Sequence, residues 1–194
     1  MTRIVIDAMG GDFAPLQQVL GAVQALNEDN AELTLEFYSE GNQIFNKVEP
    51  EKPAEFYTLG YQKSLLRGEF ESFLRGSYYR FYLTTLEDRD TIIGTVSFSH
   101  IDRGAYRSCI LGYKLLPEYQ KKGYALEAIT RLISAIFDEE KLHRIEAFVL
   151  RDNHASINLL TRIGFENEGI ARSVIKLKDG YYDHIRYVLI NPRD

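Results

Sequence analysis

Six consecutive residues in the second half of the chain have the composition of an anion-binding turn: Gln120-Lys121-Lys122-Gly123-Tyr124-Ala125. Small residues at positions 123 and 125 allow a phosphate group to approach the backbone closely. An amphipathic pattern follows, and the first turn of a helix presents N–H groups without intrahelical partners, while the helix dipole adds positive potential. Lys121 and Lys122 add positive charge. The turn therefore predicts a cradle sized for a pyrophosphate.

This turn differs from two familiar phosphate-binding patterns. It lacks the GK[ST] sequence with which a P-loop grips phosphate and magnesium, and it does not fit the G-x-G-x-x-G dinucleotide pattern. Taken alone, Q-x-x-G-x-A is a weak signal, since a glycine beside two lysines is also typical of an ordinary helix start. That structural interpretation stays open at this point.

The elements around the turn are predicted to alternate between strand and helix. Residues 108–115 predict a strand before it, and residues 144–150, apolar apart from Glu146, predict a strand after the helix. Asn153 is placed to cap a second helix, and Gly164 to end it in a left-handed conformation. The helix that follows the turn is indicated by apolar residues at helical spacing: Ala125, Ala128, Ile129, Leu132, Ile133, Ile136 and Phe137.

The remaining segments are predicted to complete one α/β or α+β sheet. Strands are expected at 78–84 and 91–99, with 108–115 as the third strand of an antiparallel meander. Asp179-Gly180 favours a two-residue type I′ hairpin between strands 173–178 and 181–190, because both turn positions need positive φ. Other expected elements are listed from the N-terminus: a strand at 4–6, a loop at 7–12, a helix at 15–26, an ambiguous segment at 33–38 and a helix over 53–74.

Length and composition predict a single domain over residues 1–194. No signal-peptide pattern opens the chain and no apolar run approaches the roughly 18 residues of a membrane span, so a cytoplasmic protein is expected. Cys109 is the only cysteine, which excludes an internal disulfide framework and any zinc site that needs several cysteines. The four histidines show no metal-ligand spacing, so no metal site is predicted.

Charge is distributed unevenly along the chain. Its acidic pI of about 5.5 argues against a general nucleic-acid binder. Residues 1–60 hold ten acidic and three basic side chains, whereas the remainder has a small positive excess. This asymmetry suits a cationic substrate at the first third and an anionic cofactor elsewhere. The alternative is a solvated acidic surface.

Several motifs occur in a fixed order around the predicted cradle. They are Gly112-Tyr113-Lys114-Leu115, Pro117-Glu118-Tyr119 leading into the cradle, Leu126-Glu127-Ala128, Leu142-His143-Arg144-Ile145-Glu146-Ala147, Asn153-His154-Ala155-Ser156, Arg162-Ile163-Gly164-Phe165-Glu166-Asn167-Glu168-Gly169 and Gly180-Tyr181-Tyr182-Asp183. Over about residues 45–190 the chain resembles the GNAT acetyltransferase superfamily. Within it, the chain looks like the RimJ/RimL branch, which acetylates the N-termini of ribosomal proteins.

The resemblance implies a GNAT fold, which is a mixed, mostly antiparallel twisted sheet with helices on both faces. It implies acetyl transfer from the cosubstrate acetyl-CoA to a primary amine by direct attack on the thioester. The family's splayed strand maps onto residues 112–116, where backbone groups pair with pantetheine and an N–H polarises the thioester carbonyl. The implied CoA-binding residues are Leu115, Gln120, Lys121, Lys122, Gly123, Tyr124, Ala125, Asn153 and Ser156.

Two catalytic residues follow from the resemblance. Many family members use a tyrosine four residues before the glycine of the G-F pair, and here that position is Leu160. Ser156, near the expected thioester sulfur, takes the role of the acid. The carboxylate of some members falls at Lys176, which leaves Glu146 as the base, directly or through water. In the structural alternatives, Glu146 pairs with a neighbouring arginine and Ser156 bonds its own helix start.

The expected acceptor is a protein or peptide N-terminus of the ribosomal-protein type. A small-molecule amine, such as a polyamine or aminoglycoside, is the alternative enzyme substrate. The rival from another class is a non-catalytic acyl-CoA-binding module, because the usual tyrosine and carboxylate are missing. No nucleic-acid or membrane partner is expected, and a homodimer stays open.

The beginning of the chain departs from this family. Residues 1–36 resemble the start of the phosphate acyltransferase of phospholipid synthesis (PlsX), through Arg3-Ile4-Val5-Ile6-Asp7-Ala8-Met9-Gly10-Gly11-Asp12 and Ala14-Pro15. The similarity fades by about residue 36, so that function is not transferred. Two interpretations follow: a replaced first strand and helix that complete the GNAT sheet, or a fused segment that packs loosely.

Overall fold

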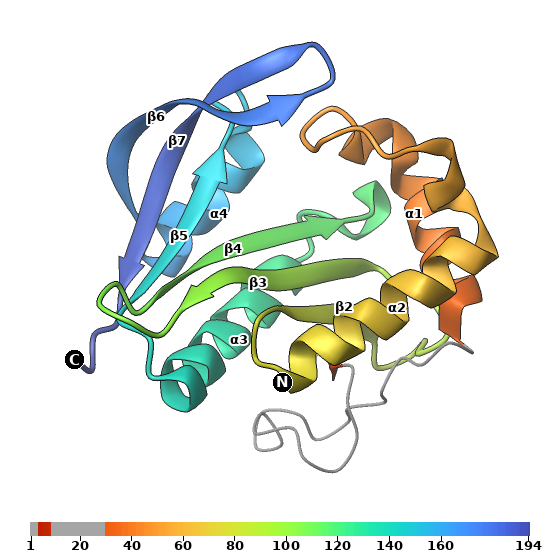
Figure 1. Ribbon diagram of the computed structural model, residues 1–194, viewed down its shortest axis with the longest axis horizontal. Helices are drawn as coiled ribbons and strands as arrows, with labels where there is room; N and C mark the ends of the chain where they lie inside the picture. The colour runs from red at the N-terminus through yellow and green to blue at the C-terminus, as the bar shows by residue number, and fades with distance from the viewer. Residues whose placement is uncertain (1–3, 9–29) are drawn as a thin grey trace.

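The protein is built on one seven-stranded sheet with the strand order β1-β2-β3-β4-β5-β7-β6 (Figure 1). The computed structural model describes residues 4–8 and 30–194. All neighbouring strands pair antiparallel except β4 and β5, which are parallel. The predicted mixed, mostly antiparallel sheet is therefore confirmed. The strands are β1 Ile4–Ala8, β2 Tyr79–Thr85, β3 Gly94–Asp102, β4 Ser108–Leu115, β5 Arg144–Val149, β6 Glu166–Leu177 and β7 Gly180–Ile190.

Helices cover both faces of this sheet. Strand β2 shows the division, since Phe81 and Leu83 pack into a core with α3, whereas Tyr82 between them packs into a core with α1 and α2. Successive side chains of a strand point to opposite faces, so the two sets of helices lie on opposite faces. The helices are α1 Ala31–Phe45, α2 Leu59–Leu74, α3 Tyr124–Glu140 and α4 His154–Ile163, with short 3₁₀ helices η3 Ala54–Tyr57 and η4 Pro117–Tyr119.

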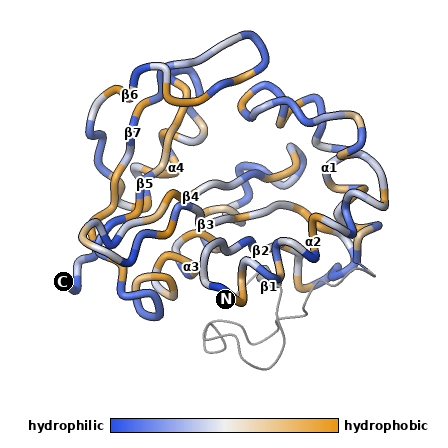
Figure 2. The backbone as a smooth tube through the Cα atoms, viewed as in Figure 1, coloured by the Kyte–Doolittle hydropathy of each residue, from blue (hydrophilic) through white to orange (hydrophobic). Residues whose placement is uncertain are grey.

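The larger core lies between α3 and the central strands. Hydrophobic and hydrophilic residues alternate along α3, as Figure 2 shows. The predicted apolar stripe of this helix is confirmed as its buried face, which comprises Ala128, Ile129, Leu132, Ile133, Ala135, Ile136 and Phe137. Burial of this stripe fixes the start of α3 beside the end of β4.

Helix α4 begins and ends as its sequence predicts. Asn153 caps it, with Oδ1 accepting a hydrogen bond from the backbone N–H of Ser156 at 3.2 Å. Gly164 follows the last turn with φ 107°, in the left-handed region that favours glycine. Its N–H donates to the carbonyl of Leu160, which satisfies one of the terminal carbonyls.

Two segments between α1 and β3 differ from expectation. The ambiguous residues 33–38 belong to α1, and the helix expected over 53–74 is divided at Thr58. Thr58 is extended, with ψ 147°, and its hydroxyl accepts from the N–H of Tyr61 to cap α2. Strands β2 and β3 start one and three residues later than predicted. In the connection between them, Thr85 N–H donates to the carbonyl of Asp88.

The terminal hairpin also corrects a prediction. Leu177 pairs with Gly180, so the two turn residues are Lys178 and Asp179, one residue earlier than expected. The turn is not type I′, because Lys178 and Asp179 both keep negative φ and only Gly180, at 150°, adopts a positive value. Gly180 lies outside the two turn positions, both of which need positive φ in a type I′ turn.

The first strand is longer than the predicted Ile4-Val5-Ile6 run. Asp7 and Ala8, expected in a loop, belong to β1 and pair with Tyr82 and Phe81 of β2. This pairing is the one expected of a replaced first strand that still completes the sheet. The rest of the predicted loop and the helix predicted over 15–26 lie outside the described residues.

Candidate active site

The sheet divides between its two parallel strands. Strands β4 and β5 pair only from Ser108 to Ile110 on β4, opposite Arg144 to Glu146 on β5. Beyond that point β4 stays with β3 as far as Leu115, while β5 stays with β7, and the two strands diverge in Figure 1. The splay expected for residues 112–116 is therefore present. We call this opening the split.

Some backbone N–H groups of β4 point toward the split. Leu116 N–H, just past the strand, donates to the carbonyl of Ile93 on the β3 side at 2.9 Å. Backbone groups point alternately to the two sides of a strand, so the N–H groups of Tyr113 and Leu115 point toward the split. The Leu115 N–H therefore has no partner in β3 and faces the opening, as expected of a group that could polarise a bound carbonyl.

The anion-binding turn lies at the end of β4. Its Gln120 side chain donates to the carbonyl of Leu115 at 3.0 Å, which ties the turn to the split. Gly123 precedes α3 with φ 90°, and Lys121 is also left-handed with φ 58°. Lys122 Nζ lies 5.5 Å from the centre of the Tyr119 ring. The structure therefore brings two lysines and the positive end of a 17-residue helix next to the split.

The start of α4 forms the other side of the split. The hydroxyls of Ser156 on α4 and Tyr113 on β4 lie 2.5 Å apart. Burial raises the pKa of the Tyr113 phenol to about 12, against a smaller opposing effect of its bond to Ser156. Leu160, at the position where a tyrosine is frequent, is fully buried. Tyr113 lies in the motif Gly112-Tyr113-Lys114-Leu115 but was not predicted as a site residue. Strand alternation could have indicated it, because it places the Tyr113 side chain on the same face as Leu111 and Leu115.

Glu146 lies on the opposite face of the sheet. It is the last β5 residue to pair with β4, and its neighbours Ile145 and Ala147 pack into the α3 core. Its Oε1 accepts from Arg144 Nε at 2.7 Å, and Arg144 also binds both carboxylate oxygens of Glu168. These bonds raise the pKa of Arg144 and lower that of Glu168. The structure does not bring Glu146 and Ser156 together: they approach the split from opposite faces.

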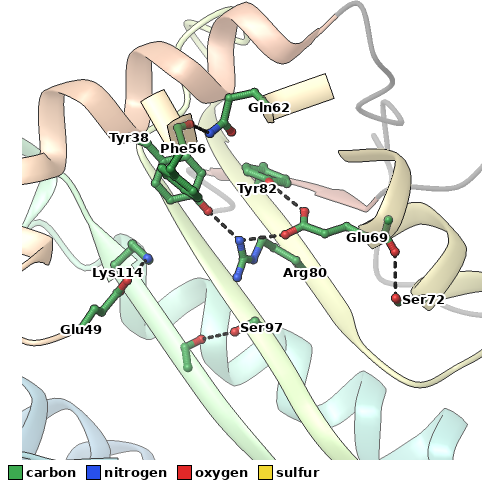
Figure 3. Close-up of polar contacts among 12 residues, drawn as sticks. Tyr38, Glu49, Phe56, Gln62, Glu69, Ser72, Arg80, Tyr82, Ser97 and Lys114 are labelled. Carbon is green, nitrogen blue, oxygen red and sulfur yellow. Dashed lines mark hydrogen bonds and ion pairs between the residues drawn. The ribbon is translucent and has the colours of Figure 1, made fainter. Parts of the chain in front are cut away.

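A cluster of charged and tyrosine side chains beneath α1 and α2, with a buried Glu69, was not predicted from the sequence. Arg80 binds Glu69 at 2.8 Å and Tyr38 at 2.6 Å, and Tyr82 donates to Glu69 at 2.8 Å (Figure 3). Burial raises the pKa of the Glu69 carboxyl, while Arg80 and Tyr82 oppose that effect. An open groove of about 360 Å³ runs beside this cluster, between α2 and β2; it is lined by Ser64, Leu65, Gly68, Glu69, Ser72, Tyr78 and Arg80.

Metal-binding clusters and membrane-spanning helices are both absent from the described part of the chain. Residues 4–8 and 30–194 hold no group of three or more His, Cys, Asp or Glu side chains arranged for a metal ion. Within the same residues, none of the helices is long and apolar enough to cross a membrane. Cys109 is a buried strand residue, and burial raises its pKa to about 12, so it is not an activated thiolate.

A mixed sheet that opens between two parallel strands, with a helix start and two lysines at one end of the opening, is the architecture expected of a CoA-dependent acyltransferase. A model of the acetyltransferase (GNAT) domain family matches residues 23–166. The chain belongs to this family and is an N-acetyltransferase that uses acetyl-CoA. Solved structures with this fold hold CoA or acetyl-CoA.

Individual relatives cover nearly the whole chain. "Probable N-acetyltransferase YjcK" of Bacillus subtilis is 34% identical over 172 residues, covering 89% of this chain and 94% of that protein. The [ribosomal protein uS5]-alanine N-acetyltransferase of Escherichia coli is 31% identical over 172 residues, covering 88% and 87%. The crystal structure of ribosomal-protein-S5-alanine acetyltransferase from Vibrio fischeri superposes with a TM-score of 0.82 at 28% identity, covering 87% and 92%.

Proposed function

We propose that the protein acetylates the N-terminal amine of a protein, of the ribosomal-protein type. The observation that carries this acceptor is the similarity over most of both chains to an enzyme named for acetylating an alanine of ribosomal protein uS5. The V. fischeri enzyme of the same type shares the fold at 28% identity. The face of the sheet on which Glu146 lies, opposite the α3 core, is the proposed side of entry for the acceptor.

Each proposed CoA-binding residue lies around the split or at its end. Gln120, Lys121, Lys122, Gly123, Tyr124 and Ala125 would bind the pyrophosphate. The backbone of residues 112–116, with Leu115 N–H toward the thioester carbonyl, would pair with pantetheine. Asn153 and Ser156 would contact the same arm from α4. The charges fit, since CoA is a polyanion and the turn supplies two lysines and a helix start.

The two groups proposed to assist the reaction would act from the two faces of the split. The acceptor amine attacks the thioester carbon, a C–N bond forms, and the C–S bond breaks with its electron pair going to sulfur. Glu146 would take the proton that the amine loses, directly or through water. Ser156, on the other face, would donate a hydrogen bond to the leaving sulfur.

Acceptor preference is tested by thiol release. The protein is incubated with acetyl-CoA and peptides that begin with Ala or Ser, and with the same peptides blocked at the N-terminus as the matched control. We expect turnover only with the free N-termini. Turnover with polyamines but with none of the peptides would replace the proposed acceptor by a small-molecule amine.

A further inference from the structure

The hydroxyls of Tyr113 and Ser156 form a contact that bridges the two sides of the split. Tyr113 comes from β4 and Ser156 from the first turn of α4, 43 residues later, and their oxygens lie 2.5 Å apart. Tyr113 Oη is also 3.5 Å from the backbone carbonyl oxygen of Ser156. The phenol is thus held against Ser156 by the packing of its ring beside the α3 core.

This contact separates the structural and functional interpretations of Ser156. Capping of α4 uses the backbone N–H of Ser156, which bonds Asn153. The Ser156 hydroxyl takes no part in that cap and bonds Tyr113 instead. The serine hydroxyl is therefore available for a role other than starting the helix.

Either hydroxyl can donate in this pair, and a proton held on Tyr113 lets the phenol be the donor. Because burial raises the pKa of Tyr113 to about 12, the phenol stays neutral and keeps its proton at physiological pH. When the phenol donates that proton to Ser156 Oγ, the serine O–H is left to donate to a third group. Hydrogen bonds in such a chain polarise one another, which makes the serine a stronger donor.

We propose that Tyr113 is a positioning residue that directs the Ser156 hydroxyl toward the sulfur of the leaving CoA. The inference rests on the proposed role of Ser156 and deepens it. When the C–S bond breaks, the serine O–H bonds the developing thiolate while Tyr113 bonds the serine. Both hydroxyls keep their protons, and water supplies the proton that the free thiol finally carries. The buried Leu160 leaves the usual tyrosine position without a hydroxyl, and Tyr113 places one at Ser156 from the other side of the split.

Binding of CoA and of desulfo-CoA, which lacks only the sulfur, tests the proposal without turnover. Affinities are measured by calorimetry from neutral to alkaline pH for the wild type and for Tyr113→Phe, which keeps the ring. We expect Tyr113→Phe to lower the affinity for the CoA thiolate about fivefold, as the loss of one hydrogen bond predicts. The affinity for desulfo-CoA should not change. Equal losses for both ligands, or no loss for either, would overturn the proposal.

A double-mutant cycle on kcat is the second measurement. Tyr113→Phe should lower kcat about fivefold in the wild type and leave it unchanged in a Ser156→Ala background, because Tyr113 acts only through the serine hydroxyl. A purely structural role would lower kcat in both backgrounds, contrary to the proposal. The double-mutant cycle can be measured with any amine that the protein acetylates, because the CoA thiolate is the leaving group with every acceptor. Activity with polyamines alone therefore refutes the proposed acceptor and still decides the role of Tyr113.

Discussion

The ammonium nitrogen of Lys114 lies 2.6 Å from Oε2 of Glu49, across 65 residues of sequence. Lys114 is in the part of β4 that borders the split, and Glu49 follows α1. The same nitrogen lies 5.2 Å from the Tyr38 ring centre and 5.1 Å from that of Phe45. This ion pair therefore attaches the segment after α1 to the strand that would hold the thioester (Figure 3).

Glu49→Gln is expected to lower the pKa of Lys114 further. Burial already lowers that pKa from 10.5 to about 8, and the attraction of Glu49 is the largest effect opposing it. Removing the carboxylate charge leaves burial less opposed. The measurement is an NMR titration of the lysine Nζ. Glu51→Gln is the matched control, because Glu51 pairs with Lys178 at 3.5 Å and both side chains are exposed. A pKa that stayed near 8 in Glu49→Gln would contradict the expectation.

Lys114 also predicts how stability depends on pH. Its pKa is about 8 in the folded chain and near 10.5 when unfolded, so between these values the unfolded state binds more protons. The contribution of Lys114 to the free energy of unfolding should therefore rise with pH across this window and stay constant below it. Urea unfolding of the wild type and of Lys114→Met tests this. The difference between the two proteins should change with pH only above about 8; a flat difference would be the contrary result.

The ends of α4 and the buried face of α3 could be predicted from the sequence, because both depend on residues that are close together in the chain. Asn153 and Gly164 mark the two ends of α4, as capping chemistry requires. The apolar stripe of α3 is buried. The splay of residues 112–116 came from the family resemblance. The type I′ prediction was wrong because the two turn residues are Lys178 and Asp179 rather than Asp179 and Gly180. The helix predicted over 53–74 is interrupted at Thr58, although its apolar spacing alone indicated one continuous helix.

Contacts between distant segments were not readable in this way. The acidic excess of the first 60 residues suggested a surface for a cationic substrate. In the fold, Glu49 is bound to Lys114 and Glu51 to Lys178 at the tip of the terminal hairpin. Part of the negative charge of the first 60 residues is therefore neutralised within the protein. The two ion pairs also join the segment after α1 to β4 and to the hairpin. Pairings over such separations depend on tertiary structure and leave no periodic pattern in the chain.

Gly123→Glu is expected to abolish acetyl-CoA binding. The new side chain would place bulk and negative charge where the pyrophosphate is proposed to bind, and it would be strained at φ 90°. Gly123→Ala is the control, because it carries the same backbone strain, about 1–2 kcal/mol, without the charge or the bulk. Calorimetry should show no binding by the first variant and retained binding by the second. Unchanged affinity in Gly123→Glu would place the pyrophosphate elsewhere.

Glu146→Gln distinguishes a catalytic role of Glu146 from a role limited to its ion pair with Arg144. If Glu146 accepts the proton of the amine, the amide should lower kcat about 100-fold or more, as for the loss of a general base. Glu168→Gln is the matched control: Glu168 binds the same Arg144 but, on β6, does not border the split. We expect Glu168→Gln to keep kcat within a few-fold of the wild type. Equal losses in the two variants would show that Glu146 serves only to hold Arg144, and the proton would then leave through water alone.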